Sequence, residues 1–180
     1  MSRTECYGAL ATLIEYPEDR ELVLANLEKV ESYLGKCGID SPARPFAVYA
    51  RSSTLASLQE DYVAAFDFNP VRAPYLGHHL YGDGHKRGAY LVRLKGEFVR
   101  YGFSHPGVEL PDHLSVLLCF LAHLCDKGEE ESRRRFIEEE VLPGVEKFCR
   151  TDEREESPWE PLFRTAELLL LADGKEVPQC

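Results

Sequence analysis

The sequence predicts an all-α protein, a single-domain helical bundle of about seven to nine helices that spans residues 1–180. Three observations support this fold class. Apolar residues recur at helical spacing in almost every segment. No run alternates apolar and polar residues for long enough to indicate a strand. A chain of 180 residues fits one domain and buries about 70% of its unfolded surface, so it needs no metal or disulfide to form a core.

The N-terminal part of the chain predicts two helices and a linker. The first helix ends before Pro17 and carries one apolar face: Tyr7, Leu10, Ala11 and Ile14. Apolar residues from Leu22 to Leu34 mark the second helix, which stops at Gly35. Residues 36–46 contain glycine, two prolines and no apolar period, which indicates a linker.

The middle of the chain predicts two helices that are separated by a long loop. The first begins near Ser52 or Ser53, either of which could cap it, and runs to Phe66. Residues 67–85 are then dense in proline and glycine, and a loop of that length in a compact domain tends to be functional. Helical period resumes from Arg87 to Tyr101, and residues 103–113 form a second loop.

The C-terminal part predicts the most apolar helix of the chain, residues 114–125, which we expect at the centre of the bundle. Pro111 suits the first position of that segment. A mixed-charge helix follows from about Glu129 to Lys147, with an interruption near Pro143. The last helix runs from Trp159 to Leu170 and has a proline in its first turn.

Charge and composition limit the partners. The chain has 31 acidic and 21 basic residues and a formal net charge of -10, which favours a partner that carries positive charge and argues against nucleic acid. The longest apolar run is far shorter than a membrane span, so we expect no membrane insertion. The six cysteines are scattered, and no secretory signal precedes them, which favours free thiols in a cytoplasmic protein.

Residues 132–137, Ser-Arg-Arg-Arg-Phe-Ile, resemble the core of a twin-arginine export signal. A true signal lies near the N-terminus and precedes an apolar segment, whereas this stretch runs into Glu138–Glu140. Glu129–Glu131 lie three to four positions before the arginines, which is the spacing of helical ion pairs. We interpret the stretch as a solvated, salt-bridged helix face.

Histidine and cysteine residues raise the question of a metal site. Thiolate and imidazole suit zinc, and Cys119 lies four positions before His123, but the paired clusters of a zinc finger are missing from the sequence. The sequence also has no nucleophile elbow and no phosphate-binding loop of the usual spacing. We expect no metal and no enzyme activity. A metal-binding or small-molecule-processing protein that uses the His and Cys set remains an alternative.

The two loops hold most of the remaining polar side chains, among them His79, Asp83, Glu109 and His113. Together with the neighbouring apolar helices they predict an apolar groove with an acidic, histidine-rich mouth. Simpler roles are open for single residues. Asp112 could stabilise a helix N-terminus, and Arg87 could pair with Asp83 across a turn.

Ten spaced elements between residues 55 and 125 form a family pattern: Leu58-Gln59, Tyr62-Val63, Phe66-Asp67, Tyr75-Leu76, His79, Gly82-Asp83, Arg87-Gly88, Leu94, Tyr101-Gly102 and Leu110-Pro111-Asp112. In this pattern the chain resembles the TorD/DmsD redox-enzyme maturation chaperones, and within them the NarJ branch that assembles nitrate reductase. The resemblance implies a TorD-like, all-helical, cytoplasmic chaperone that is not an enzyme and has no cofactor of its own.

The resemblance also implies a partner. Members of this family bind the N-terminal signal, twin-arginine or vestigial, of the catalytic subunit of a molybdenum-dependent oxidoreductase and assist cofactor insertion and complex assembly. Transient contact with the molybdenum cofactor of that client is compatible with this role, and the chaperone could be a monomer or a homodimer. A permanent scaffold subunit of the oxidoreductase is a further alternative. The residues that we expect to bind the peptide are Tyr62, Phe66, Tyr75, His79, Asp83, Arg87, Glu109, Asp112 and His113.

Overall fold

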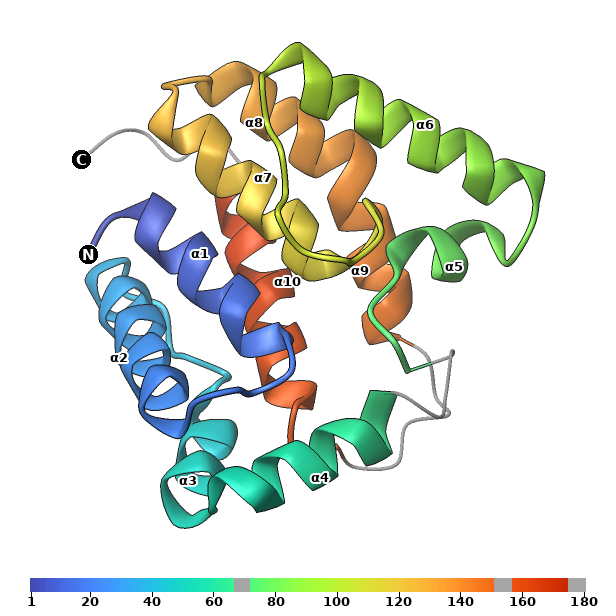
Figure 1. Ribbon diagram of the computed structural model, residues 1–180. Coiled ribbons are helices and arrows are strands. Elements are labelled where there is room, and N and C mark those ends of the chain that lie inside the picture. Colours follow the sequence, from blue (N-terminus) through green and yellow to red (C-terminus); the bar gives the residue numbers. More distant parts are fainter. Residues whose placement is uncertain (67–71, 151–156, 175–180) are drawn as a thin grey trace.

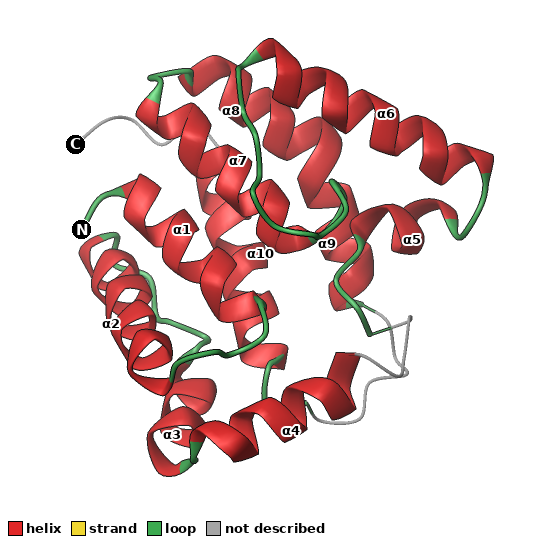
Figure 2. Cartoon of the chain, viewed as in Figure 1, coloured by secondary structure: helices red, strands yellow, loops and turns green. Residues whose placement is uncertain are grey.

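The computed structural model describes residues 1–66, 72–150 and 157–174. In these ranges every regular element is helical, which confirms the predicted all-α class (Figure 2). The elements in order are α1 (Arg3–Ile14), α2 (Arg20–Lys36), α3 (Arg44–Ser52), α4 (Leu55–Phe66), α5 (Leu76–Tyr81), α6 (His85–Arg100), α7 (Leu114–Asp126), α8 (Glu130–Phe136), the π-helical segment η1 (Ile137–Val141), α9 (Leu142–Cys149) and α10 (Glu160–Gly174). None of these helices is both long enough and apolar enough to cross a lipid bilayer.

Helix α7 lies at the centre of the bundle, as its apolar sequence predicts. It packs mainly along α1, and α1 also packs on α2 and α10 (Figure 1). The first helix begins with a capping box, in which the Ser2 hydroxyl accepts from the Glu5 backbone N–H and the Glu5 carboxylate accepts from the Ser2 N–H. Helix α6 runs along the outer edge of the bundle, and the loop that follows it crosses in front of α7 (Figure 1).

Two helices occupy segments that the sequence predicts as linker or loop. Helix α3 starts inside the predicted linker 36–46, with a proline in its first turn, a position that needs no backbone N–H. Its buried residues, Phe46, Ala47 and Ala50, are too few to form a clear period. Helix α5 lies within the predicted loop 67–85 and has only six residues. The sequence pattern misses both helices for the same reason. Each helix is short and is flanked by proline and glycine, so its few apolar residues show no helical period.

The predicted interruption of the mixed-charge helix is present as η1, just before Pro143. The Leu142 N–H donates to the Ile137 carbonyl, five residues back, instead of the usual four. Tyr90 of α6 donates to the Glu140 carbonyl at 2.6 Å, and Arg93 binds both carboxylate oxygens of Glu140 at 2.7 and 3.0 Å. The Tyr90 hydroxyl thus provides a hydrogen-bond partner for the Glu140 carbonyl of η1, and the contacts of Tyr90 and Arg93 together hold α6 against η1.

The twin-arginine-like stretch is not fully solvated, and this interpretation is wrong for Arg133. The Arg133 side chain is 0% exposed and forms ion pairs with Asp173 of α10 and, at 2.6 Å, with Glu130. Tyr7 of α1 donates to Asp173 as well, and burial, with the neighbouring Asp173 carboxylate, raises the pKa of Tyr7. The i,i+3 and i,i+4 spacing shows which charges can pair along a helix, but it does not show that α1 and α10 cover one of them.

We expect Asp173→Ala to destabilise the fold by about 3–5 kcal/mol, because it leaves the buried Arg133 guanidinium without its main partner. Urea denaturation followed by circular dichroism measures the change. Asp126→Ala, at the exposed end of α7, is the matched control and should shift the free energy of unfolding by less than about 0.5 kcal/mol. Equal effects of the two substitutions would contradict a stabilising role for the Asp173 ion pair.

Candidate functional site

The two loops that the sequence predicts as functional meet at a short antiparallel bridge between Tyr75 and His113. The Leu76 N–H donates to the Asp112 carbonyl, and the Leu114 N–H donates to the Pro74 carbonyl, each at 2.9 Å. The bridge therefore joins the start of α5 to the start of α7. It brings together side chains that lie almost forty positions apart in the sequence.

A buried ion pair lies beside this bridge. The Asp112 carboxylate is 0% exposed and accepts from Arg87 Nε at 2.8 Å. Arg87 also pairs with Asp83 at 3.1 Å, as one of the simpler interpretations of the sequence predicts. Asp83 in turn lies 3.1 Å from His78 Nδ1, and the hydrogen bonds from His78 and Arg87 lower the pKa of Asp83. Gly77 makes room for the pair, because a Cβ atom there would lie 2.6 Å from Asp112 Oδ2.

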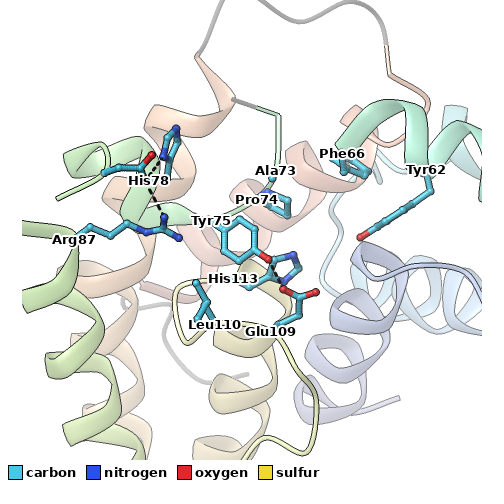
Figure 3. Close-up of a pocket in the computed structure, with 11 residues that line it drawn as sticks. Tyr62, Phe66, Ala73, Pro74, Tyr75, His78, Arg87, Glu109, Leu110 and His113 are labelled. Carbon is cyan, nitrogen blue, oxygen red and sulfur yellow. Dashed lines mark hydrogen bonds and ion pairs between the residues drawn. The ribbon is translucent and has the colours of Figure 1, made fainter. Parts of the chain in front are cut away.

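A pocket of about 490 Å³ opens between the bridge and the end of α4 (Figure 3). Its walls come from α4, from α5 and the segment before it, from the turn into α6 and the start of that helix, and from the loop before α7. The lining residues are Tyr62, Phe66, Ala73, Pro74, Tyr75, His78, Asp83, Arg87, Glu109, Leu110 and His113.

The α4 wall of the pocket is aromatic. Tyr62 and Phe66 contact each other edge to face, with ring centroids 4.8 Å apart, and both rings pack against Trp159. The Tyr62 hydroxyl donates to the Ile14 carbonyl at 3.2 Å, which ties this wall to the end of α1. Figure 3 shows the two aromatic side chains across the opening from Tyr75. This wall offers apolar surface that is already held in place by the core.

The opposite wall is polar. The Tyr75 hydroxyl donates to Glu109 Oε2, and burial together with this carboxylate raises the pKa of Tyr75. The Tyr75 ring packs edge to face on His113 at 4.9 Å, and the Arg87 guanidinium lies 5.5 Å from its centroid. Tyr75 is thus fixed on three sides. It holds the Glu109 carboxylate at the pocket wall.

His113 caps the central helix and also lines the pocket. Its Nδ1 accepts from the Ser115 backbone N–H at 3.3 Å and lies 2.7 Å from the Ser115 hydroxyl. Burial lowers the pKa of His113, although Glu109 and Asp112 act in the opposite direction. A neutral ring whose Nδ1 accepts carries its proton on Nε2. The ring therefore presents an N–H group and no charge.

The pocket brings together seven of the nine predicted residues: Tyr62, Phe66, Tyr75, Asp83, Arg87, Glu109 and His113. The other two do not line it. His79 packs on α9, where its ring contacts Phe148, and its Nε2 is 3.0 Å from the Ala73 carbonyl. Asp112 lies beneath the pocket and positions Arg87.

Four lining residues are not in the predicted peptide-binding set: Ala73, Pro74, His78 and Leu110. The choice between His78 and His79 depends on the helical phase of α5, and a six-residue helix inside a proline- and glycine-rich stretch shows no such phase. Leu110 belongs to the family pattern and directly follows Glu109 in the second loop, and either signal could have indicated it.

The residues considered for metal binding do not gather. Among the described residues, no group of three or more His, Cys, Asp and Glu side chains could hold a metal ion. His123 Nε2 lies 2.9 Å from the Tyr101 carbonyl, and burial raises the pKa of Cys119 to about 11. Cys119 and Cys125 are free thiols on the central helix, where they fill space between apolar neighbours.

A protein-family model matches most of the chain. The family described as nitrate reductase delta subunit matches residues 36–165. A solved structure from Archaeoglobus fulgidus, described as that of a candidate redox enzyme maturation protein, has the same fold. Its TM-score is 0.60 at 19% sequence identity, over 95% of each chain.

Three curated proteins show similarity over different lengths. A Bacillus subtilis protein, named as a probable nitrate reductase molybdenum cofactor assembly chaperone NarJ, is 27% identical over 87% of this chain and 83% of its own length. The Escherichia coli K12 nitrate reductase molybdenum cofactor assembly chaperone NarJ is 28% identical over 64% of this chain, which spans half of that protein. The chaperone protein TorD of Shewanella amazonensis is 36% identical over 38% of this chain and 28% of its own length.

We expect Gly77→Ala to destabilise the protein by about 1–3 kcal/mol, because the added methyl group collides with the buried Asp112 carboxylate. Gly8→Ala in α1 is the matched control, since nothing lies within 4 Å of its added Cβ atom. That substitution should stabilise the protein by about 0.5–1 kcal/mol. Chemical denaturation of both variants measures these opposite signs. A stabilising Gly77→Ala would contradict the close approach of Asp112.

We also expect His113 to make the protein sensitive to mild acid. Its folded pKa lies below the ordinary value of 6.5, so the unfolded chain takes up the proton first as the pH falls. The stability that the neutral, buried His113 contributes is present above pH 6.5. It is lost as the pH falls from there through the pKa of His113 in the folded protein. His113→Asn keeps a side chain that can cap α7 but removes the titration.

The measurement is the free energy of unfolding as a function of pH for three proteins. Between about pH 7.5 and 5.5, His113→Asn should lose less stability than the wild type. His85→Asn, at an exposed position, is the control and should follow the wild-type curve. Parallel curves for the wild type and His113→Asn would contradict the burial of a neutral His113.

Proposed function

The chain belongs to the nitrate reductase delta subunit family, and on this premise we propose that it is an assembly chaperone for a molybdenum-dependent oxidoreductase. In this role it binds the N-terminal segment of the client's catalytic subunit, a twin-arginine or vestigial signal, in the cytoplasm. It holds that segment during cofactor insertion and complex assembly and catalyses no reaction itself. The names of the Bacillus subtilis and Escherichia coli relatives support this proposal.

The observation that carries the proposal is the pocket between α4 and the Tyr75–His113 bridge. A signal segment has an apolar stretch and a basic end. The aromatic wall of Tyr62 and Phe66 suits the first, and the carboxylates of Glu109 and Asp83 suit the second. Such a segment would find both kinds of contact within one opening.

The size of the pocket suits part of a peptide. Its volume of about 490 Å³ lies within the usual range of ligand pockets, about 300–1,000 Å³. It therefore has room for a few side chains of a bound segment, while the rest of the segment would lie on the surface. A folded domain could not enter it.

The energetics suit a chaperone that must release its client. Removal of about 300 Å² of apolar surface from water contributes roughly 7 kcal/mol at 25 cal/mol per Å². A charge-assisted hydrogen bond to a carboxylate adds about 1.5–3 kcal/mol. With two such hydrogen bonds the gross total is roughly 10–13 kcal/mol. Association and ordering of a flexible peptide cost several kcal/mol, so the balance lies near -8 kcal/mol, which is micromolar affinity.

We expect Leu110→Ser to weaken peptide binding about fivefold, because it removes about 1 kcal/mol of apolar contact at the pocket wall. The assay is calorimetric titration with a synthetic peptide of the N-terminal segment of a molybdenum oxidoreductase catalytic subunit. Leu110 is 45% exposed, so its substitution should leave the fold intact.

Leu22→Ser is the matched control, because Leu22 is also 45% exposed but lies on α2, away from the pocket. It should bind the peptide as the wild type does. Equal weakening by both substitutions, or no effect of either, would argue that the peptide binds elsewhere. The absence of binding to the wild-type protein would argue against the proposed function.

A further inference from the structure

The carboxylates around the pocket are not equivalent. Asp112 is buried and paired with Arg87. Asp83 is paired with both Arg87 and His78. Glu109 accepts a hydrogen bond from the Tyr75 hydroxyl, which carries no charge, and has no ion pair with any described residue. Its negative charge is thus the one among the three that no cation of the described chain balances.

The cation in the pocket wall is correspondingly occupied. Arg87 donates from Nε and Nη2 to Asp112 and from Nη1 to Asp83, so two carboxylates share its charge. The buried His113 accepts from the Ser115 N–H at Nδ1, as a neutral ring does, and adds no balancing cation. The polar wall therefore has a net negative character that comes from Glu109. It suits a cationic group and disfavours an anion.

We propose that Glu109 is the specificity-determining residue of the pocket and selects a basic side chain of the bound segment that directly neighbours an apolar residue. This inference rests on the proposed function and names the chemistry that the pocket distinguishes. The apolar neighbour follows from the geometry, because Glu109 and Leu110 line the same pocket as Tyr62 and Phe66 (Figure 3). A ligand cation at Glu109 is thus followed within a short distance by apolar surface.

Tyr75 is the positioning residue for this contact. Its hydroxyl fixes Oε2 of Glu109, and its ring is held by His113 and Arg87. The second carboxylate oxygen, Oε1, has no partner among the described residues. An oriented carboxylate loses little side-chain entropy when it binds a guanidinium group, and a guanidinium group can use both oxygens at once.

The test is a double-mutant cycle measured by calorimetric titration. The first probe is a synthetic peptide with the core Ser-Arg-Arg-x-Phe-Leu followed by apolar residues, and the second has both arginines replaced by citrulline, which keeps the shape but removes the charge. The wild-type protein should bind the arginine peptide about tenfold or more tightly than the citrulline peptide. Glu109→Gln should bind the two peptides with nearly equal affinity.

Two further variants sharpen the result. Asp83→Asn removes a pocket carboxylate that is already paired, so it should keep most of the preference for arginine. Tyr75→Phe keeps Glu109 but removes the hydroxyl that orients it, so the preference should fall without disappearing. A general loss of protein stability would weaken the binding of both peptides alike. It would leave the ratio of their two affinities unchanged.

The outcomes separate this inference from the proposed function. If Glu109→Gln prefers the arginine peptide over the citrulline peptide as strongly as the wild type does, the role of Glu109 is overturned, even though peptide binding itself persists. Loss of the preference in Asp83→Asn alone would assign the selection to Asp83 and would overturn the inference equally. A wild-type preference in Tyr75→Phe would overturn the positioning role. If neither peptide binds the wild-type protein, the proposed peptide site fails, and the inference fails with it.

Discussion

The ion pair between Arg87 and Asp112 sets how α5, α6 and the start of α7 meet. A fully buried carboxylate without a cation would cost several kcal/mol, so Asp112 requires Arg87 beside it. Gly77 leaves the space in which the carboxylate lies, and the bridge between Tyr75 and His113 closes next to it. The positions of Tyr75 and His113 on that wall of the pocket follow from this arrangement.

The arrangement also separates structural from available charge. Asp112 and Arg87 neutralise each other within the fold, while Glu109 is oriented by an uncharged hydroxyl and keeps its charge. The aromatic wall on α4 is supported by Trp159, so its apolar surface is rigid. The pocket thus combines a firm apolar wall with one unbalanced carboxylate. This combination fits a basic and apolar segment better than it fits an anion or a metal ion.

Much of the fold could be predicted from the sequence, because long helices carry their apolar period within a few turns. The faces of α1, α2 and α7 are examples. The convergence of the two loops was predicted from their polar residues and from the apolar helices beside them. The sequence does not show which side chains other helices bury in the folded protein. It therefore cannot show that Arg133 lies beneath α1 and α10, or that Asp112 lies beneath the pocket. The short helices α3 and α5 and the orientation of His79 escaped for a related reason, since their structure depends on packing rather than local pattern.

The π-helical segment η1 has a consequence for how related chains should be compared. One additional residue in a helical turn rotates everything after it by about 100° about the helix axis. Downstream of η1, Gly144 of α9 faces Leu76 so closely that a Cβ atom at Gly144 would lie 2.7 Å from the Leu76 Cβ atom. Leu76 belongs to α5 and directly follows Tyr75. A related chain with one residue fewer across Ile137–Val141 should therefore hold α5 in a different position. Length variation in η1 would therefore alter the support of the pocket, although no residue of η1 lines it.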